Sequence, residues 1–214
     1  MKLLKFNSYE DYKRIQIETN KRKLQKISTT AKELRFVANF IQKNIPEASF
    51  GLCHGVRNGY EVKQLRALLG VNVLGTEISE TANQFEHVMQ WDFHDVKQEW
   101  TGNVDFIYSN AWDHSYDPDA MLRSWMSCLR PNGRCFLQWT RRHTDRALRG
   151  ADCFGLSFDE MIQWASKDYK VEKVKKIQEF KSFNALTLLQ DIFKKGRLSI
   201  RGGKVFIVIL KNKN

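Results

Sequence analysis

A glycine turn and an acidic residue each follow a short apolar segment, and eighteen residues separate the end of the turn from the acid. The turn, His54–Gly59, follows the segment 48–53, and the acid, Glu77, follows the segment 71–76. A strand that leads into a helix through a glycine turn brings backbone N–H groups and a helix N-terminus close to a ligand. An acid at the end of the second strand suits hydrogen bonding to the two hydroxyls of a ribose. This order indicates a nucleotide-shaped site at the carboxyl edge of a parallel sheet.

Further polar residues follow the later strand-like segments. Asp92 closes the third segment, Ser109 and Asn110 close the fourth, and Asp113 and His114 come shortly after. A histidine with an ordinary pKa of about 6.5 can take a proton from a hydroxyl at neutral pH, so His114 is a candidate base. In the alternative interpretation His114 orients its loop. Asp113 either orients His114 or caps the following turn.

Five strands and two helices are predicted to position these residues. The strands are expected near 48–54, 71–77, 87–91, 104–109 and 134–139, and the helices near 59–69 and 118–130. The apolar character of the fourth and fifth strands is typical of strands that are covered on both faces. Pro131–Gly133 predicts a turn between the second helix and the fifth strand.

Residues 1–45 are predicted to form an N-terminal helical extension, and residues 46–214 the main domain. Residues 9–25 are polar with few apolar positions, as in a surface helix. Thr30 is expected to cap a second helix, Ala31–Lys43, whose apolar residues recur at helical spacing. This extension is expected to pack on the sheet edge or to overhang the site.

The C-terminal part contains a predicted loop followed by patterned segments. Residues 141–155 are polar, arginine-rich and without period, which predicts a loop. Ser157–Glu160 has the spacing of a capping box and is expected to open a helix through Ala165. Residues 169–177 alternate with period two, as in a half-buried strand. The remaining predicted elements are the buried strand 204–210, the helix 184–195 and the turn 201–203.

In this order the motifs resemble the class I S-adenosylmethionine-dependent methyltransferases, in the branch whose fourth strand ends in a Ser-Asn…Asp-His element. The matching motifs are His54–Gly59, Gly75–Ser79, Gln90–His94, Asp105–Asn110, Asp113–Pro118 and Leu129–Gly133. The resemblance implies an α/β fold with a doubly wound, mostly parallel, seven-stranded Rossmann-like sheet and an antiparallel edge strand, the last two strands forming an antiparallel pair. It implies S-adenosyl-L-methionine as the cofactor and says little about the methyl acceptor.

The same resemblance assigns roles to individual residues. The implied cofactor-binding residues are Cys53, His54, Gly55, Gly59, Glu77, Ile78, Asp92, Phe93, Ser109 and Asn110, and the implied catalytic residues are His114 and Asp113. The two glycines would approach the amino-acid end of the cofactor, and Glu77 would bind the ribose. Asp92 would accept from the adenine amino group, with Phe93 or Trp91 over the ring. Ser109–Asn110 would contact the methionine part.

Two positions depart from the pattern of this family. Arg57 stands at the middle glycine of the turn, and Cys53 stands where an acid usually precedes it. A carbonyl near Cys53 or His54 is therefore expected to hold the methionine amine. Asp95 remains an alternative to Asp92 for the adenine amino group.

Composition narrows the class of protein. The chain has 214 residues and a formal net charge of +11, with basic residues concentrated in the N-terminal segment and the C-terminal third. These charges form solvated faces or attract an anionic acceptor, such as a phosphorylated sugar, RNA or an anionic lipid surface.

The four cysteines form no regular pairs, which is typical of a reducing cytoplasm. The histidines have no metal-ligand spacing, so no metal is expected. No segment approaches the ~20 apolar residues of a membrane span, and no signal sequence is indicated.

The sequence therefore predicts a cytoplasmic methyltransferase that transfers a methyl group to a small polar acceptor, with a hydroxyl, for example of a saccharide, as the expected target. An RNA acceptor is the alternative within this class, and only the charge supports it. A nicotinamide-dependent oxidoreductase is disfavoured, because the turn lacks the Gly-x-Gly-x-x-Gly pattern. A cofactor-binding module without catalysis is the remaining alternative. The oligomeric state is not predicted.

Overall fold

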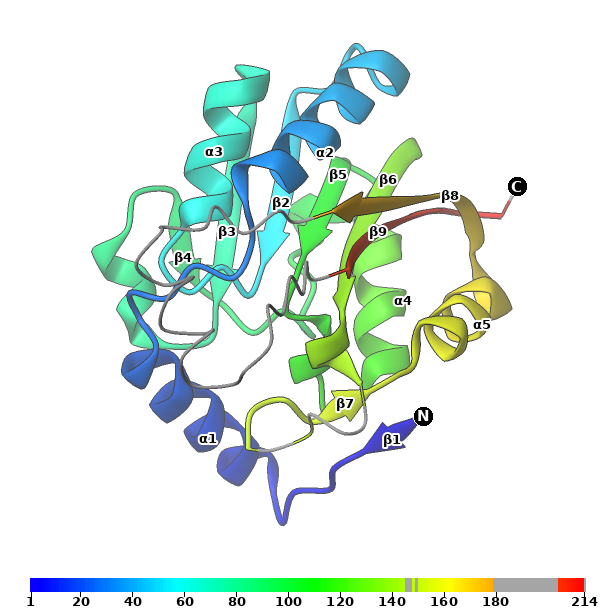
Figure 1. Cartoon of the computed structure of the whole chain (residues 1–214). Helices are drawn as coiled ribbons and strands as arrows, with labels where there is room; N and C mark the ends of the chain where they lie inside the picture. The colour runs from blue at the N-terminus through cyan, green and yellow to red at the C-terminus, as the bar shows by residue number, and fades with distance from the viewer. Residues whose placement is uncertain (145–147, 149, 179–203, 214) are drawn as a thin grey trace, which may run out of the picture.

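A seven-stranded mixed sheet with helices on both faces forms the centre of the molecule (Figure 1). The computed structural model describes residues 1–144, 148, 150–178 and 204–213. In their order across the sheet, the strands are β4 (Val88–Gln90), β3 (Asn72–Glu77), β2 (Phe50–His54), β5 (Val104–Ser109), β6 (Leu129–Thr140), β9 (Lys204–Lys211) and β8 (Lys170–Gln178). Adjacent strands from β4 to β6 are parallel, and β9 is antiparallel to both of its neighbours. The predicted α/β fold class and the antiparallel pair at one edge are confirmed.

Two pairs of helices cover the two faces of the sheet. The helices are α2 (Ala31–Asn44) and α3 (Tyr60–Leu69) on one face, and α4 (Pro118–Cys128) and α5 (Phe158–Asp168) on the other. Alternate residues of β5 supply both cores, because Phe106 and Tyr108 pack with α2 and α3 whereas Ile107 packs with α4 and α5. This double coverage is the physical reason for the apolar character of the central strands.

Local sequence signals set the starts of two helices as predicted. The Thr30 side chain accepts from the backbone N–H of Glu33 at the start of α2, and Ser157 does the same for Glu160 at the start of α5. In both cases the glutamate side chain also accepts from the N–H of the capping residue, which completes a capping box. These bonds satisfy N–H groups that a helix start would otherwise leave unpaired.

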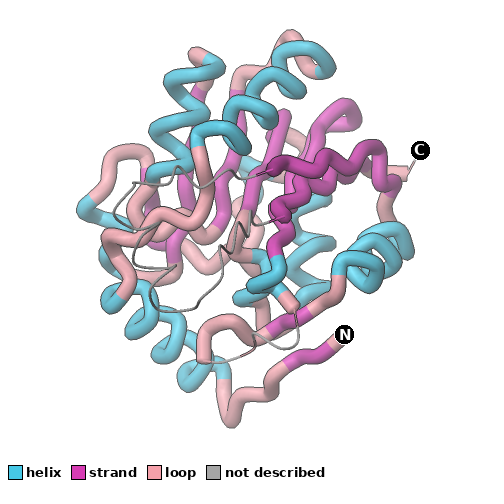
Figure 2. Tube along the Cα trace, viewed as in Figure 1, coloured by secondary structure: helices cyan, strands magenta, loops and turns pink. Residues whose placement is uncertain are grey.

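The N-terminal segment contains a strand as well as helices, which the sequence did not predict. Strand β1 (Lys2–Leu3) pairs antiparallel with β7 (Phe154–Gly155) and leads into α1 (Tyr9–Arg22), as Figure 2 shows. The predicted loop 141–155 is therefore wrong at β7, and a short 3₁₀ helix, Arg141–His143, opens it. Two-residue strands show no sequence period, so only their pairing in the folded chain reveals them.

The predicted turn at Pro131–Gly133 lies within β6, whose pairing with β5 is interrupted at this point. Val104 pairs with Leu129, whereas Phe106 pairs with Arg134, so the turn residues form an irregularity inside the strand. These turn-forming residues produce a bulge in β6 shortly after α4 ends at Cys128.

The remaining predictions concern the cysteines, membrane-spanning helices and the segment 184–203. All four cysteines are buried and free. Among the described helices, none is long and apolar enough to cross a membrane. The predicted helix 184–195 and the predicted turn 201–203 fall outside the described residues.

Candidate active site

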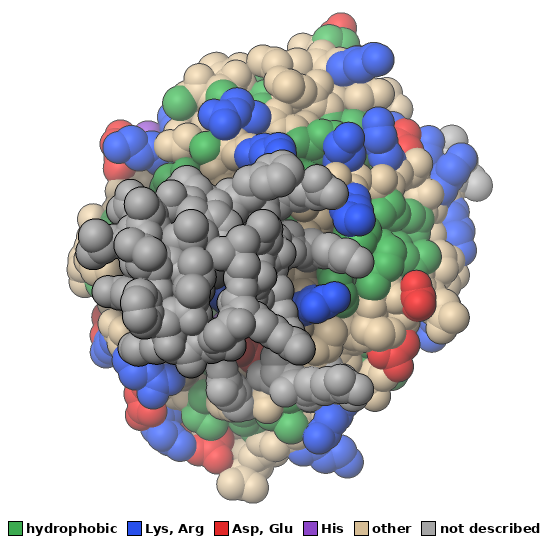
Figure 3. All heavy atoms as spheres, viewed as in Figure 1, with side chains coloured by type: hydrophobic (Ala, Val, Ile, Leu, Met, Phe, Trp, Pro, Cys, Tyr) green, Lys and Arg blue, Asp and Glu red, His purple; other side chains and the backbone are tan. Residues whose placement is uncertain are grey.

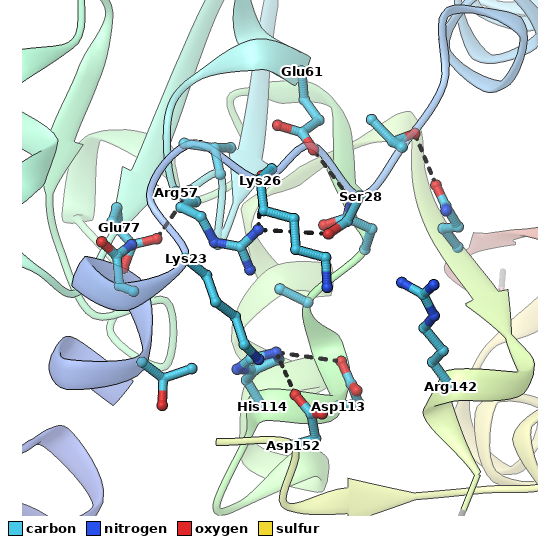
Figure 4. Close-up of a pocket in the computed structure, with 18 of the residues that line it drawn as sticks. Lys23, Lys26, Ser28, Arg57, Glu61, Glu77, Asp113, His114, Arg142 and Asp152 are labelled. Atoms are coloured by element: carbon cyan, nitrogen blue, oxygen red, sulfur yellow. Dashed lines mark hydrogen bonds and ion pairs between the residues drawn. The ribbon is translucent and has the colours of Figure 1, made fainter. Parts of the chain in front are cut away.

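A cavity of about 440 Å³ lies at the carboxyl ends of β2, β3 and β5, with α1 and the segment 23–30 on its other side. Eight of the predicted site residues line it: Gly55, Glu77, Ile78, Asp92, Phe93, Asn110, Asp113 and His114. Parallel strands end at one edge of a sheet, and this geometry brings the residues together. The close-up in Figure 4 shows Glu77, His114 and several cationic side chains around the same hollow.

Four residues that were predicted to bind the cofactor do not line this cavity. Cys53 is fully buried in the core, and Gly59 is the N-terminal cap of α3. The His54 ring stacks on Trp125 at 4.7 Å between ring centroids. Ser109 Oγ donates to the carbonyl oxygen of His54 at 3.0 Å. Their contacts with a cofactor stay predictions.

The glycine turn has a backbone conformation that explains its first residue. Gly55 has φ +72°, and a Cβ at this position would lie 2.6 Å from Cβ of Ala111. Only glycine allows this close approach of two strand ends. Arg57 also has a positive φ, of 51°, which is unusual for a residue with a side chain. A hydrogen bond of 2.9 Å from its backbone N–H to Glu77 Oε2 holds this conformation.

The Glu77 carboxylate is fixed at the end of β3. Oε2 accepts from the backbone of Arg57, and Oε1 accepts from the N–H of Ser79 at 3.2 Å. Burial raises the pKa of Glu77, and these two hydrogen bonds oppose the rise. The side chain of Asn20 provides a further hydrogen bond. Because each carboxylate oxygen can accept about two hydrogen bonds, these three partners do not use the full capacity of Glu77. The contact of Glu77 with the ribose hydroxyls stays a prediction.

The Asp92 carboxylate is already engaged by two neighbours. Oδ1 accepts from the backbone N–H of His94 at 2.9 Å and lies 2.7 Å from its Nδ1, and Oδ2 accepts from the Tyr9 hydroxyl at 2.7 Å. Burial acts to raise the pKa of Asp92, but the hydrogen bonds from His94 and Tyr9 outweigh it and lower the pKa. One of about four acceptor positions remains, so the adenine contact stays a prediction.

A buried cluster around His114 combines residues from three parts of the chain. Gln16 of α1 donates through Nε2 to the carbonyl oxygen of Ala151, so its Oε1 accepts from Nδ1 of His114 at 2.9 Å. This arrangement assigns the proton of neutral His114 to Nδ1 and leaves a lone pair on Nε2. Nε2 lies 3.3 Å from Asp152 Oδ1 and 4.0 Å from Asp113 Oδ1.

Burial controls the protonation of this cluster. It lowers the pKa of His114 to about 4, an effect that the charge of Asp152 opposes. It raises the pKa of Asp113, and the charge of Asp152 adds to that rise. His114 is therefore neutral at pH 7, with its Nε2 lone pair available to accept a proton.

The same cluster has three potential metal-ligand atoms within 4.8 Å of one another, on Asp113, His114 and Asp152. Burial raises the pKa of Asp113 and lowers that of His114; the positive charge of Lys23 opposes the first effect and adds to the second. Because a cationic side chain already faces these groups, we treat the cluster as an acid–base site.

Several residues of the cavity were not singled out by the sequence. They are Gln16, Glu61 and Asp152, together with Lys23, Lys26 and Arg142 as specific members of the basic excess. Gln16 and Asp152 carry no local signal, because they meet His114 only through the fold. Glu61 could have been found as an acid two residues after the glycine turn.

Solved structures with a similar fold include methyltransferases of different specificities. The 1,6-didemethyltoxoflavin-N1-methyltransferase of Burkholderia thailandensis, with bound 1,6-didemethyltoxoflavin and S-adenosylhomocysteine, is 11% identical, with 99% of this chain and 93% of that chain covered and a TM-score of 0.69. A SAM dependent methyltransferase from Archaeoglobus fulgidus is 16% identical, with 84% and 94% covered and a TM-score of 0.52. The mitomycin 7-O-methyltransferase MmcR is 14% identical, with 86% and 54% covered and a TM-score of 0.57.

No protein-family model and no curated protein matches the sequence. The likeness in structure shows that the chain has the fold of these S-adenosylmethionine-dependent methyltransferases.

Proposed function

We propose that this chain is an S-adenosylmethionine-dependent methyltransferase that acts on a hydroxyl of a small anionic acceptor. The observation that carries the proposal is the meeting, in one cavity, of the close-approach turn at Gly55, the fixed carboxylate of Glu77 and the Nε2 lone pair of His114. The turn at Gly55 fits the amino-acid part of such a cofactor, and the carboxylate of Glu77 fits its adenosine part. When bound, S-adenosylmethionine supplies a methyl group that its sulfonium already activates.

In this proposal His114 accepts the proton of the acceptor hydroxyl at Nε2. Gln16 keeps the other ring nitrogen protonated, which fixes the tautomer that can act as a base. Asp152, at 3.3 Å from Nε2, stabilises the imidazolium that results. Because Asp113 is buried and its pKa is raised, it contributes little negative charge to this step and supports the position of the loop.

Four cationic side chains favour an anionic acceptor, such as a phosphorylated saccharide. Lys23, Lys26, Arg57 and Arg142 all line the cavity, as Figure 4 shows. Burial lowers the pKa of Lys26, and the charges of Arg142, Lys23 and Arg57 lower it further. None of the four forms an ion pair with a described residue. A phosphate group would supply the opposite charge that this convergence lacks.

The overall charge gives no comparable support for an RNA acceptor. Among the described residues that are visible in Figure 3, the lysine and arginine side chains are scattered and separated by other residue types. Nucleic-acid-binding surfaces usually concentrate basic residues along one groove or face. A small anionic acceptor in the cavity is therefore the function we propose.

Thermal unfolding tests the cofactor assignment directly. S-adenosylmethionine and S-adenosylhomocysteine should each raise the melting temperature, because a ligand at 100 times its Kd adds about 2.7 kcal/mol to the stability of the native state. NAD at the same concentrations serves as the control and should have no effect. Stabilisation by NAD alone would overturn the proposal in favour of an oxidoreductase.

Matched acceptors test the anionic part of the proposal. Hexose phosphates should support formation of S-adenosylhomocysteine, whereas the corresponding free hexoses should not. Arg142→Ala should raise KM for the phosphorylated acceptor about 10–150-fold, since a charge-assisted hydrogen bond contributes about 1.5–3 kcal/mol. The control, Arg35→Ala, removes an exposed arginine from α2 and should have no effect. Equal rates with both kinds of hexose would contradict the anionic assignment.

A further inference from the structure

Glu61 is a buried carboxylate in the wall of the cavity, and no cationic residue of the described part of the chain forms an ion pair with it. It belongs to the first turn of α3, is only 6% exposed, and points toward the hollow in Figure 4. Its Oε1 accepts from Nδ2 of Asn110 at 3.1 Å. No described lysine, arginine or histidine lies within ion-pair distance of it. A buried carboxylate in this state is costly unless a positive group pairs with it.

The pKa of Glu61 is also that of a buried carboxylate without an ion-pair partner among the described residues. Burial raises its pKa to about 7, while the hydrogen bond from Asn110 and the charge of Arg57 act in the opposite direction. The apo protein therefore holds Glu61 as a mixture of neutral and charged forms near neutral pH. A bound cation beside the carboxylate would shift this equilibrium to the charged form.

The location of Glu61 fits the amino-acid end of the proposed cofactor. Burial raises the pKa of Cys53 near the end of β2 and of Tyr108 in β5, and the charge of Glu61 adds to both rises, so the carboxylate lies close to these strand ends. The sequence predicted a carbonyl near Cys53 or His54 as the partner of the methionine amine. The carbonyl of His54 already accepts from a serine hydroxyl, whereas the carboxylate of Glu61 faces the cavity.

Arg57 presents the opposite charge from the same turn. Its Nη1 donates to the carbonyl oxygen of Lys26 at 2.9 Å and lies 3.5 Å from Ser28 Oγ, which holds the guanidinium against other residues of the cavity wall. An arginine has five N–H donors, so donors remain for a carboxylate. One short segment thus places a cation and an anion on the wall of one cavity, as a zwitterionic ligand requires.

We propose that Glu61, supported by Asn110, binds the α-ammonium group of the methionine moiety and that Arg57 binds its α-carboxylate. Lys23, Lys26 and Arg142 then remain for the anionic acceptor. This inference rests on the proposed function, because it concerns the same cofactor. It gives the two departures from the family pattern, at Cys53 and Arg57, a common explanation. The turn replaces a missing acid before it with an acid after it, and its extra arginine neutralises the other end of the ligand.

Two ligands that differ only in the amino-acid part test the inference by calorimetry. S-adenosylhomocysteine carries the α-ammonium and α-carboxylate, whereas 5′-methylthioadenosine keeps the adenosine and the sulfur but lacks both groups. Glu61→Gln keeps the size of the side chain and its bond to Asn110. It should weaken S-adenosylhomocysteine binding about 10–100-fold and leave 5′-methylthioadenosine binding unchanged. Glu47→Gln, at an exposed position, is the control.

The outcomes separate this inference from the proposed function. If wild type binds neither ligand, the proposed function fails. If wild type binds S-adenosylhomocysteine and Glu61→Gln binds it equally well, the inference alone is overturned. Equal losses for both ligands would assign Glu61 to loop structure and would also overturn it.

Proton release provides a second readout in wild type. Because the pKa of Glu61 is about 7 in the free protein, binding of an ammonium group at pH 7 should release a fraction of one proton. Calorimetry in buffers of different ionisation enthalpy measures this fraction. Release that is absent from wild type, or that persists in Glu61→Gln, would contradict the role of Glu61.

Discussion

Replacing His114 by alanine is expected to lower the rate of methyl transfer by about 10²–10⁴-fold, the range for a general base. The affinity for S-adenosylhomocysteine should change little, because the Nε2 lone pair is proposed to act on the acceptor. Turnover is measured as S-adenosylhomocysteine formation with a phosphorylated acceptor, and affinity by calorimetry. His114→Gln is the matched variant, since it keeps a polar side chain without a base. Equal losses in turnover and affinity would assign His114 to loop structure, and an unchanged rate would remove it from the site.

The pH dependence of the wild-type rate follows from the burial of His114. A base must be unprotonated, so the rate should fall as the pH decreases through the pKa of His114. Burial places that pKa at about 4 in the free protein, well below the ordinary value. At saturating S-adenosylmethionine, kcat/KM for the acceptor should therefore show no fall caused by His114 as the pH decreases through about 6.5. Asp152→Asn removes the charge that raises this pKa and should move the acidic limb to still lower pH. A fall in rate centred on the ordinary histidine pKa of about 6.5 would contradict the buried environment assigned to His114.

Replacing Glu77 by alanine should weaken S-adenosylhomocysteine binding by about 1.5–3 kcal/mol, or about 10–150-fold. The variant removes a carboxylate proposed to accept from both ribose hydroxyls. It also removes the acceptor that holds the positive-φ backbone of Arg57. Calorimetry on folded protein gives the affinity. Glu80→Ala, three residues further on, removes an exposed acid that pairs with Lys21 and should leave the affinity unchanged. Unchanged affinity in Glu77→Ala would show that the end of β3 does not bind the ribose.

The elements that the sequence predicted well are those with long, consistent patterns. Strand β5 has the predicted bounds, 104–109, because both of its faces are buried and its residues are correspondingly apolar. Helix α2 begins at the predicted cap, Thr30, which forms a capping box with Glu33 in the structure. The patterns were insufficient for β1 and β7, which have two residues each and exist only because they pair with each other.

The predicted positions of Gly55, Glu77 and His114 in one cavity follow from the sequence, because strand order and glycine spacing are local properties that determine which residues end parallel strands. Their electrostatic environment does not follow from it. Gln16 lies 98 residues from His114 in the chain, and its contact depends on the packing of α1 against the strand ends. The pairing of His114 with Asp152 and the burial of Glu61 likewise arise from the fold. The sequence by itself thus determined the fold class and the edge of the sheet that carries the site. The tertiary structure decided the tautomer, the pKa and the charge partners of its residues, because these depend on distance and desolvation between segments far apart in the chain.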